Sequence, residues 1–418
     1  MRFQTPRGTH DMLPSQAHAW HWVESSFSKL ARTYGYSEIR TPMFEDIELF
    51  IRTSGETSDV VSKEMYEFVD RGGRRLSLKP EGTAPAMRSY VEHSLGAAGG
   101  VTRLYYVTPV FRYNRPAKGR YRQHHQTGLE LIGSPAPEAD AEIIEMTVRH
   151  FQALGLRDLE VQLNSIGREA CRLAYREAVL NHMASYLADQ SEEFQATAQK
   201  NPLRLLDTKD PETRAALEGL PPITDYLEPE SKARLEAIER LLAEAGIPYR
   251  ISPDVVRGLD YYTETVFEIT SGDLGAQNSL CGGGRYDNLI KDIGGPPTPS
   301  VGVGMGIERA LLVLTELGLV PSAEPPMAFA VSGVPEASAS VRSLAREVRA
   351  KGMACLWDVE GKAIKAQMKQ VDRSKVRFAL IVGSDELAAG TVSIREMATG
   401  EQVVVPASEV AAWLDARR

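Results

Sequence analysis

The alternation of apolar and polar residues predicts a long β-hairpin between Leu104 and Gly133. The first strand, Leu104–Tyr113, is rich in aromatic and β-branched residues, which suit a pleated surface. The second strand, Gln123–Ile132, alternates, so that Gln126 and Glu130 share one face while Leu129 and other apolar residues share the opposite face. The pattern therefore predicts a sheet with a core behind it and polar groups in front.

The connection between these two strands is a basic loop. The segment Arg112–Arg122 contains five Lys/Arg and no Asp/Glu, and a proline and Gly119 favour a turn within it. If the hairpin turns about Gly119, Arg112 lies opposite Gln126. A solvent-exposed polar hairpin would explain one or two of these charges. The grouping of Arg112, Gln126 and Glu130 on one face instead favours an anionic ligand near Arg112 and a polar ligand near Glu130, with the loop against phosphates.

The rest of the pattern predicts a mixture of helices and strands. Ala17–Tyr34 has apolar residues at helical spacing, and Gly35 follows it as a typical C-terminal glycine. Further helices are expected over residues 86–94, 138–154 and 306–317, and strands over 37–45, 66–69, 75–78, 159–163 and 262–269. The last strand is expected to pair with a segment that ends at Gly282-Gly283-Gly284.

Two changes in pattern predict the domain organisation. Residues from Arg168 to about Arg250 are predominantly helical and interrupt the strand-rich part of the chain, as an insertion would. The proline-rich segment 321–326 reads as a linker. Strands and helices alternate over residues 327–418, which predicts a small α/β domain around a partly parallel sheet.

Composition narrows the class of protein. The chain has 418 residues, of which 43% are hydrophobic and 25% charged, so it is a globular protein with two or three domains. No run of about 18 apolar residues predicts a membrane span, and the N-terminus lacks the apolar core of a signal peptide. Three distant cysteines predict a reducing compartment without disulfides or a cysteine-based zinc site, and hence a cytoplasmic protein.

Charge distribution bears on nucleic-acid binding. The formal net charge is -8, which argues against non-specific binding to nucleic acid. The segment 327–418 is mildly basic and the remainder is acidic. Any nucleic acid must therefore be held by local basic patches.

A glycine-rich segment, Gly302–Gly306, precedes the helix that begins near Arg309. Its spacing is GxGxG and no βαβ unit supports it, so a dinucleotide fingerprint is weakly supported. The glycines, Gly304 among them, would let the backbone approach a ligand closely. Arg309 has apolar neighbours, where an unpaired charge is costly. A buried salt bridge and a phosphate contact are equally consistent with it.

Two further segments carry candidate chemistry. Arg257 stands beside a glycine on a turn, where a guanidinium suits bidentate contact with a carboxylate or phosphate. Tyr261 and Tyr262 follow, and such tyrosines are most often core residues. Three consecutive glycines after Cys281 mark a place where something packs against bare backbone. Cys281 itself is interpreted as a small buried residue.

Together these segments resemble the histidyl-tRNA synthetases, a family of class II aminoacyl-tRNA synthetases. The resemblance covers essentially the whole chain. It is carried by the start TPRGTHDMLP, by Gly35–Phe50 (motif 1), Tyr106–Gly133 (motif 2), Gly302–Leu312 (motif 3), RGLDYY at Arg257–Tyr262 and GGGRYDNL at Gly282–Leu289. It implies an α+β fold: an antiparallel-sheet catalytic domain (1–320) with a helical insertion (about 168–250), a linker (321–326) and an α/β anticodon-binding domain (327–418).

The resemblance also implies the reaction and its residues. Histidine and ATP, with Mg²⁺, would give histidyl-adenylate and pyrophosphate, and the histidyl group would pass to the 3′ end of tRNA-His. No residue is identified that holds the metal. The implied catalytic arginines are Arg112, Arg257 and Arg309. The implied ATP contacts are Arg112, Glu81, Arg309 and Gly304, and the implied histidine contacts are Glu81, Thr83, Gln126, Glu130, Arg257, Tyr261 and Tyr262.

The basic loop is implied to meet the acceptor end of the tRNA through Arg115, Lys118, Arg120 and Arg122. Here the chain departs from the family, because Asn114-Arg115-Pro116-Ala117 stands where ERPQ is frequent, and His124 stands where phenylalanine is common. A homodimer is implied, since motif 1 is a dimer-interface element. Two alternatives remain at this point. One is a catalytically silent paralogue that regulates an ATP phosphoribosyltransferase, and the other is a different class II synthetase.

Overall fold

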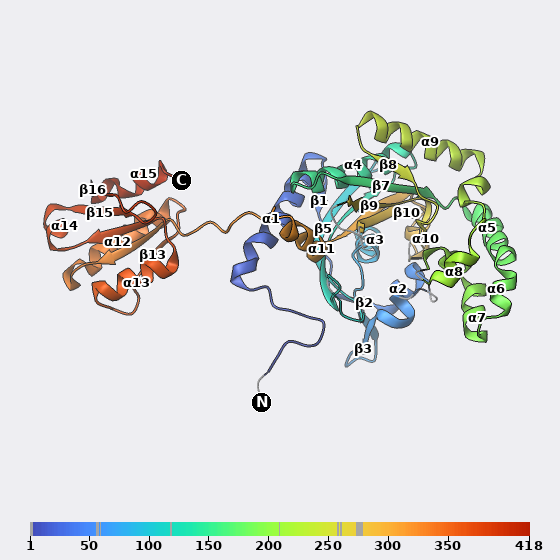
Figure 1. Ribbon diagram of the computed structural model, residues 1–418, viewed down its shortest axis with the longest axis horizontal. Helices are drawn as coiled ribbons and strands as arrows, with labels where there is room; N and C mark the ends of the chain where they lie inside the picture. The colour runs from blue at the N-terminus through green and yellow to red at the C-terminus, as the bar shows by residue number, and fades with distance from the viewer. Residues whose placement is uncertain are drawn as a thin grey trace. The chain divides into compact units, whose positions relative to one another are not determined.

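The computed structural model describes residues 3–55, 58, 60–117, 119–208, 210–256, 259, 261–272 and 279–418. The chain folds into two compact units, Met1–Pro321 and Ser322–Arg418, and Figure 1 draws the second unit in orange to red. Each unit has its own core and is described by itself.

An eight-stranded sheet organises the first unit, in the order β1-β5-β6-β11-β10-β9-β7-β8 (Figure 1). Neighbours from β5 to β7 are antiparallel, whereas the outer strands β1 and β8 run parallel to β5 and β7. The strands are β1 (Ser37–Glu38), β5 (Thr102–Phe111), β6 (Gln123–Ile132), β7 (Leu159–Ser165), β8 (Tyr249–Ile251), β9 (Thr263–Ser271), β10 (Ser279–Arg285) and β11 (Ser300–Gly306).

One face of this sheet is covered by helices that form the larger core. They are α1 (Pro14–Thr33), α4 (Pro137–Ala153), α9 (Pro229–Glu244) and α11 (Ile307–Glu316). The helix predicted over 17–34 is confirmed as α1, which buries Trp20, Val23 and Phe27 and ends before Gly35 at φ +79°. Leu129 and Leu131 of β6 point into the same core, as the alternation predicts.

The opposite face carries a second core and a smaller sheet. The helices on this side are α2 (Ile47–Ser54), α3 (Thr83–Glu92), α5 (Glu169–His182), α6 (Ala184–Ala188), α7 (Glu192–Lys200), α8 (Pro211–Ala216) and α10 (Leu289–Asp292). Region 168–250 is helical, as its pattern predicts, and α5–α8 lie together at one side of the unit (Figure 1). A three-stranded sheet of β2 (Phe44–Asp46), β4 (Arg75–Leu78) and β3 (Tyr66–Val69) lies near α2.

The central hairpin forms, but its predicted register is wrong. Thr108, not Arg112, pairs with Gln126. The amide of Arg112 instead donates to the carbonyl of Arg122 at 2.8 Å. The difference is an even number of residues, so Arg112 keeps the face on which it was expected. Turn residues alone did not identify the centre of a loop of this length.

The second unit is a five-stranded sheet in the order β13-β12-β14-β15-β16, with β13, β12 and β14 parallel and the rest antiparallel. The α/β pattern predicted for this region is confirmed. Its elements are β12 (Ala328–Ser332), α12 (Ser338–Ala350), β13 (Cys355–Trp357), α13 (Ile364–Ser374), β14 (Phe378–Val382), α14 (Ser384–Ala389), β15 (Thr391–Glu396), β16 (Gln402–Pro406) and α15 (Val410–Asp415).

Within the described part of the chain, no helix is both long enough and apolar enough to cross a membrane. Cys171, Cys281 and Cys355 are all buried, and none of the three is in a disulfide. The interpretation of Cys281 as a small buried residue is therefore confirmed.

Candidate active site

A cavity of about 60 Å³ lies on the sheet face opposite α1 and α4. Seven residues singled out from the sequence line it: Glu81, Thr83, Arg112, Gln126, Tyr261, Tyr262 and Gly304. The other lining residues are Leu259, Gly282, Tyr286, Gly302 and Val303. Residues from six separate segments thus converge on one small polar space. Arg257 lies outside the described residues.

Glycines form the floor of the cavity. Gly302 pairs with Glu130 on one side and Gly284 on the other, while Gly304 pairs with Gly128 and Gly282. A Cβ on Gly302 would collide with Glu130 Oε2 and the Tyr286 hydroxyl. The absence of side chains on three adjacent strands therefore leaves room for polar groups above bare backbone, as the glycine runs indicated.

Glu130 is fully buried beside this floor. The hydroxyl of Tyr106 donates to its Oε1 at 3.1 Å, and the hydroxyl of Tyr286 donates to Oε2. Burial raises the pKa of Glu130 well above its usual range, and Glu81 adds to this effect while hydrogen bonds to Thr83 and Tyr106 oppose it. Two tyrosine hydroxyls therefore hold the carboxyl oxygens in place inside an aromatic pocket, and the raised pKa favours the protonated form of the group.

The turn before α3 is tied to the central hairpin. Glu81 caps α3 by accepting from the amides of Thr83 at 2.6 Å and Ala84 at 2.7 Å. The amide of Gly82 donates to Gln126 Oε1 at 3.1 Å, and Arg112 Nε donates to the carbonyl of Pro80 at 2.7 Å. Burial raises the pKa of Glu81. These contacts bring a carboxyl, an amide and a guanidinium to one edge of the cavity.

Three tyrosine rings close the pocket on another side. The ring centroids of Tyr261 and Tyr262 are 4.7 Å apart, and those of Tyr261 and Tyr286 are 5.5 Å apart. Tyr262 packs over Gly284, where a Cβ would come within 2.9 Å of its ring. Aromatic walls with a buried acceptor suit a flat, polar ring.

Arg309 lies in the first turn of α11 and is not among the residues that line the cavity. Its Nε donates to the carbonyl of Ser279 at 2.9 Å. Burial lowers its pKa, and nearby Arg120 lowers it further. The preceding residue, Glu308, accepts from the amide of His125 at 2.9 Å and contacts His125 Nδ1 at 3.0 Å. The positive charge of Arg120 therefore acts on Arg309 from the basic loop.

The basic loop, defined as Asn114–Arg122, presents Arg115 and Arg120 to solvent. Arg122 is half-buried: its guanidinium lies 3.8 Å over the ring of Tyr113, and its Nε donates to the carbonyl of Asn114 at 3.3 Å. Lys118 lies outside the described residues. The exposed charges are therefore those of Arg115 and Arg120, while Arg122 stabilises the loop.

Sequence reasoning missed Tyr106 and Tyr286 as partners of Glu130. Tyr286 belongs to a motif that was noticed for its glycines, and Tyr106 pairs with Gly128 across the hairpin. Their hydroxyls are identified only by the side-chain positions. The register Tyr106–Gly128 would have been a signal, because a large ring opposite a glycine covers it.

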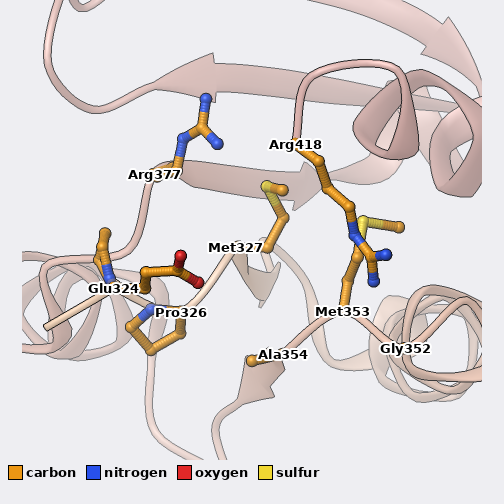
Figure 2. A pocket seen from close by; sticks show the side chains of 9 residues that line it. Glu324, Pro326, Met327, Gly352, Met353, Ala354, Arg377 and Arg418 are labelled. Carbon is orange, nitrogen blue, oxygen red and sulfur yellow. The ribbon is translucent and has the colours of Figure 1, made fainter. Parts of the chain in front are cut away.

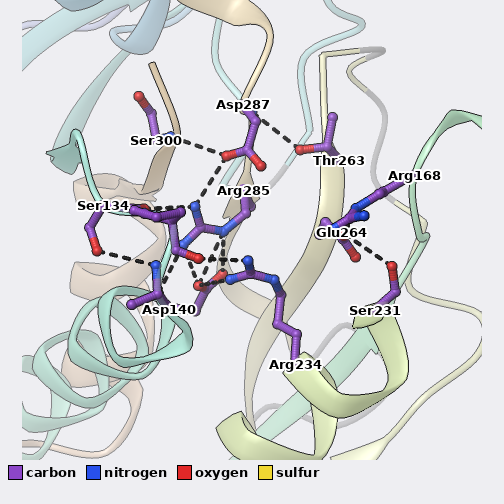
Figure 3. Close-up of polar contacts among 12 residues, drawn as sticks. Ser134, Asp140, Arg168, Ser231, Arg234, Thr263, Glu264, Arg285, Asp287 and Ser300 are labelled. Carbon is purple, nitrogen blue, oxygen red and sulfur yellow. Dashed lines mark hydrogen bonds and ion pairs between the residues drawn. The ribbon is translucent and has the colours of Figure 1, made fainter. Parts of the chain in front are cut away.

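A buried ion-pair network next to the pocket was missed as well (Figure 3). Arg285 is fully buried and bonds Asp140 Oδ2 through Nη2 at 2.5 Å and Asp287 through Nη1 at 3.1 Å. Arg234 of α9 approaches the same Asp140 at 3.5 Å. Burial alone would lower the pKa of Arg285, but Asp140 and Asp287 raise it. The network joins the end of β10, directly before Tyr286, to α4 and α9.

The second unit contains a different pocket of about 680 Å³ (Figure 2). Arg377, Arg418, Met327 and Met353 lie around it, and Arg418 Nη2 donates to the carbonyl of Lys351 at 2.9 Å. Its lining residues include no histidine or cysteine. The acid, amide and aromatic groups suited to chemistry on a small polar ligand are instead those of the first unit.

The described residues contain no group of three or more His, Cys, Asp or Glu that could hold a metal ion. Mg²⁺ commonly needs only one or two carboxylates when substrate phosphates supply its other ligands. The lining of the cavity includes one carboxyl group, that of Glu81, which is a ligand of this kind.

Comparison with known proteins agrees with this geometry. A model of the histidyl-tRNA synthetase family matches residues 8–310, and a model of the anticodon binding domain matches residues 328–417. The histidine–tRNA ligase of Thermosynechococcus vestitus is 45% identical over 410 residues, which are 98% of this chain and 96% of the relative. That of Natranaerobius thermophilus is 44% identical over 409 residues, 97% of both chains.

Solved structures give the same result. The crystal structure of apo S. aureus histidyl-tRNA synthetase superimposes with a TM-score of 0.84 at 35% identity, covering 99% of this chain and 100% of that chain. A Bacillus halodurans structure described as an ATP phosphoribosyltransferase regulatory subunit/histidyl-tRNA synthetase has a TM-score of 0.67 at 23% identity, covering 92% and 99%. At that identity it shows a shared fold only.

Proposed function

The chain belongs to the histidyl-tRNA synthetase family, and from this premise we propose that it joins L-histidine to tRNA-His at the expense of ATP. The observation that carries the proposal is the cavity beside Glu130, which combines a buried acceptor, aromatic walls and the Glu81–Gln126–Arg112 edge. The family model covers that entire region of the chain.

The first step activates histidine. An oxygen of the histidine carboxylate attacks the α-phosphorus of ATP, the bond between the α- and β-phosphates breaks, and pyrophosphate leaves. The nucleophile is already ionised, so no general base is required. Arg112, Arg257 and Arg309 neutralise charge that develops on the phosphate oxygens. Arg112 suits this role because the hydrogen bond from its Nε to the carbonyl of Pro80 fixes the guanidinium at the edge of the cavity.

The second step transfers histidine to tRNA. The terminal ribose hydroxyl attacks the carbonyl carbon of histidyl-adenylate, and AMP leaves. Arg115 and Arg120 suit contact with phosphates of the acceptor end because both are exposed on the basic loop. Arg122 supports that loop through Tyr113, and Lys118 completes the predicted set.

Selection of histidine rests on the buried polar groups. An imidazole has two ring nitrogens that need partners. Glu130 and Tyr262 would bracket the ring, while Glu81, Thr83 and Gln126 hold the α-amino and carboxylate groups, with Tyr261 as a wall. An apolar isostere of histidine would leave those groups unpaired. The kcat/KM for histidine is therefore expected to exceed that for such an isostere by a factor on the order of 10⁴.

The catalytic assignment is favoured over a regulatory paralogue. The two relatives that are 45% and 44% identical over nearly the full length are histidine–tRNA ligases, and a model of the anticodon binding domain matches residues 328–417. The pocket also retains the acceptor and the aromatic walls that histidine requires. The same polarity argues against glycine, proline or threonine as the substrate.

The assembly, the metal and the compartment are part of the same proposal. A homodimer is supported by apolar side chains left exposed on the small sheet around motif 1: Met43, Phe44, Phe68 and Val69. Mg²⁺ would bind the phosphates of ATP and reduce their negative charge, with one or two carboxylates completing its ligands. Free buried cysteines support a cytoplasmic location.

Pyrophosphate exchange tests the assignment. With a panel of amino acids, only histidine should drive exchange of labelled pyrophosphate into ATP, and tRNA-His should then be charged. If another amino acid drove the exchange instead, that amino acid and not histidine would be the substrate. Absence of both exchange and charging would favour the regulatory paralogue.

Arg112→Ala should slow exchange by about 10²-fold, the size of effect expected when a transition-state charge loses one donor. Arg74→Ala is the matched control, because that arginine side chain is 77% exposed on the β3–β4 turn and away from the cavity. Arg112 would have no part in catalysis if the two variants exchanged at equal rates.

A further inference from the structure

The segment before α1 makes a tight turn that none of the proposed catalytic steps uses. The amide and the Oγ1 of Thr9 both donate to the carbonyl of Pro6, at 3.0 and 2.7 Å. Gly8 sits inside this turn at φ +85°, a conformation that favours glycine. The segment Pro6–His10 therefore has a defined shape although it is largely exposed.

This turn contacts the base of the basic loop directly. The amide of Arg122 donates to the carbonyl of Gly8 at 2.7 Å, and the carbonyl of Arg122 accepts from the amide of Arg112. A Cβ on Gly8 would lie 2.7 Å from Cγ and 2.8 Å from Cδ of Arg122. The glycine is thus required both by its backbone angle and by the close approach of the loop.

A ring contact reinforces the backbone contact. The rings of His10 and Tyr121 lie 4.6 Å apart, and Trp20 of α1 lies 6.5 Å from His10. Trp20 also packs edge-on to His125, 4.9 Å away, which in turn contacts Glu308. The segment therefore rests on a continuous set of rings that reaches the start of α11.

The other side of the loop is held by a different part of the chain. The amide of Tyr113 donates to the carbonyl of Glu64 at 2.7 Å, and its ring lies 5.5 Å from that of Tyr66. Arg122 stacks on Tyr113 from within the loop. The base of the loop thus contacts the segment Pro6–His10 on one side and the region around Glu64–Tyr66 on the other. Arg115 and Arg120 remain exposed to solvent.

Arg112 does not depend on the segment in the same way. Its Nε bonds Pro80, and the amide of the preceding Phe111 donates to the carbonyl of Lys79 at 2.9 Å. These contacts belong to the turn before α3 and to the sheet. Loss of the segment should therefore disturb the loop more than the guanidinium at the cavity.

We propose that Pro6–His10 is a brace that positions the basic loop for the acceptor end of tRNA, with Gly8 and His10 as positioning residues. The inference rests on the proposed function, because it assigns the loop to tRNA. Gly8 and His10 would then act in the transfer step although neither contacts histidine or ATP.

The test compares His10→Ala, His10→Phe and Gly8→Ala with Phe3→Ala. Phe3 is a control that precedes the segment and has a side chain that is 98% exposed. His10→Ala should raise the KM for tRNA-His by about threefold to tenfold, the equilibrium equivalent of one aromatic pair. His10→Phe should bring this KM most of the way back to the wild-type value, because a ring again faces Tyr121. Histidine-dependent exchange and the unfolding temperature should stay at the wild-type values in both.

Amide hydrogen exchange over residues 112–122 provides a readout without substrates. Gly8→Ala and His10→Ala should accelerate exchange at the Arg122 amide, whereas Phe3→Ala should not. The brace is refuted if this exchange and the KM for tRNA are unchanged, or if pyrophosphate exchange falls in parallel with charging. A wild-type protein that shows no histidine-dependent exchange would refute the proposed function instead, and the hydrogen-exchange result would still decide the brace.

Discussion

Burial controls the protonation of several side chains in the first unit. It raises the pKa of Glu130 and of Glu81, and it lowers the pKa of Lys79 to about 8 and that of His150 to about 4. In each case the low-dielectric interior disfavours the charged form. Glu81 lines the cavity and Glu130 is buried beside it, so both carboxyl groups lie close to the space that a ligand would occupy. His150 lies in the core of α4 and bears only on stability.

His150 makes acid stability a test of this principle. In the folded state its pKa is about 4, against 6.5 for an exposed histidine, so below pH 6.5 the unfolded chain binds the proton more tightly. Stability contributed by the neutral ring is complete above pH 6.5 and is lost as pH falls towards 4. Between pH 7.5 and 5 the loss should be about 2 kcal/mol.

His150→Phe should remove that part of the pH dependence, because a phenyl ring can keep the packing against Phe27, now at 5.2 Å. Urea denaturation of both proteins at pH 7.5 and pH 5 measures the difference. An equal loss of unfolding free energy in the two proteins would mean that the His150 ring is not held neutral.

At the scale of elements, the site is made by strand register. The hairpin of β5 and β6 was predictable from alternation, and a slip of an even number of residues left Arg112 on the correct face. The pairing of β6 with β11 and of β11 with β10 was not predictable from local pattern, because those strands are distant in the chain. That pairing places Gly302 beside Glu130, where a side chain would collide with the buried carboxyl group.

The elements around the pocket are joined by the Arg285 network (Figure 3). Arg285→Met should lower the free energy of unfolding by about 3–5 kcal/mol, because it leaves Asp140 as a buried charge without its main partner. Urea denaturation measures this. The matched control is Arg40→Met, which breaks a 2.7 Å pair with Glu38 at the surface and should leave the midpoint unchanged.

A second variant separates charge from packing. Asp140→Asn combined with Arg285→Met should recover part of the lost stability, because the uncompensated carboxylate is then gone. If the double variant were less stable than Arg285→Met, the stability lost in Arg285→Met would come from packing rather than from an unpaired charge.

At the scale of the whole molecule, the two units have separate tasks in the proposed reaction. The cavity lies entirely within the first unit, and the two cores around it use no residue beyond 320. The second unit has its own cores and matches the anticodon binding domain. Activation of histidine should therefore need only the first unit, whereas recognition of tRNA should need both.

A fragment of residues 1–321 tests this division. It should fold and support histidine-dependent pyrophosphate exchange, because every described group that lines the cavity remains. Its kcat/KM for charging tRNA-His should fall by at least about tenfold, since any contacts that an anticodon binding domain makes to the tRNA would be lost. Loss of exchange in a fragment that circular dichroism shows to be folded would mean that the second unit contributes to activation.

The sequence by itself determined the elements, their faces and the residue types at the site. Alternation and helical spacing depend on local geometry, so α1, the central hairpin and the strands of the second unit were predictable within a few residues. The motifs also identified Glu81, Thr83, Arg112 and Gln126 as candidates, and these residues share one cavity.

Only the tertiary structure decided what those residues contact. The hairpin register, and with it the hydroxyl of Tyr106 on Glu130, lies within one hairpin but was not identified by turn residues alone. The hydroxyl of Tyr286 on Glu130 and the buried pair of Arg285 with Asp140 join segments far apart in the chain. The same holds for Gly8 against Arg122, which are more than a hundred residues apart. Contacts of this kind follow from the packing of the whole unit, because burial and partner choice are properties of the assembled core and not of any local stretch.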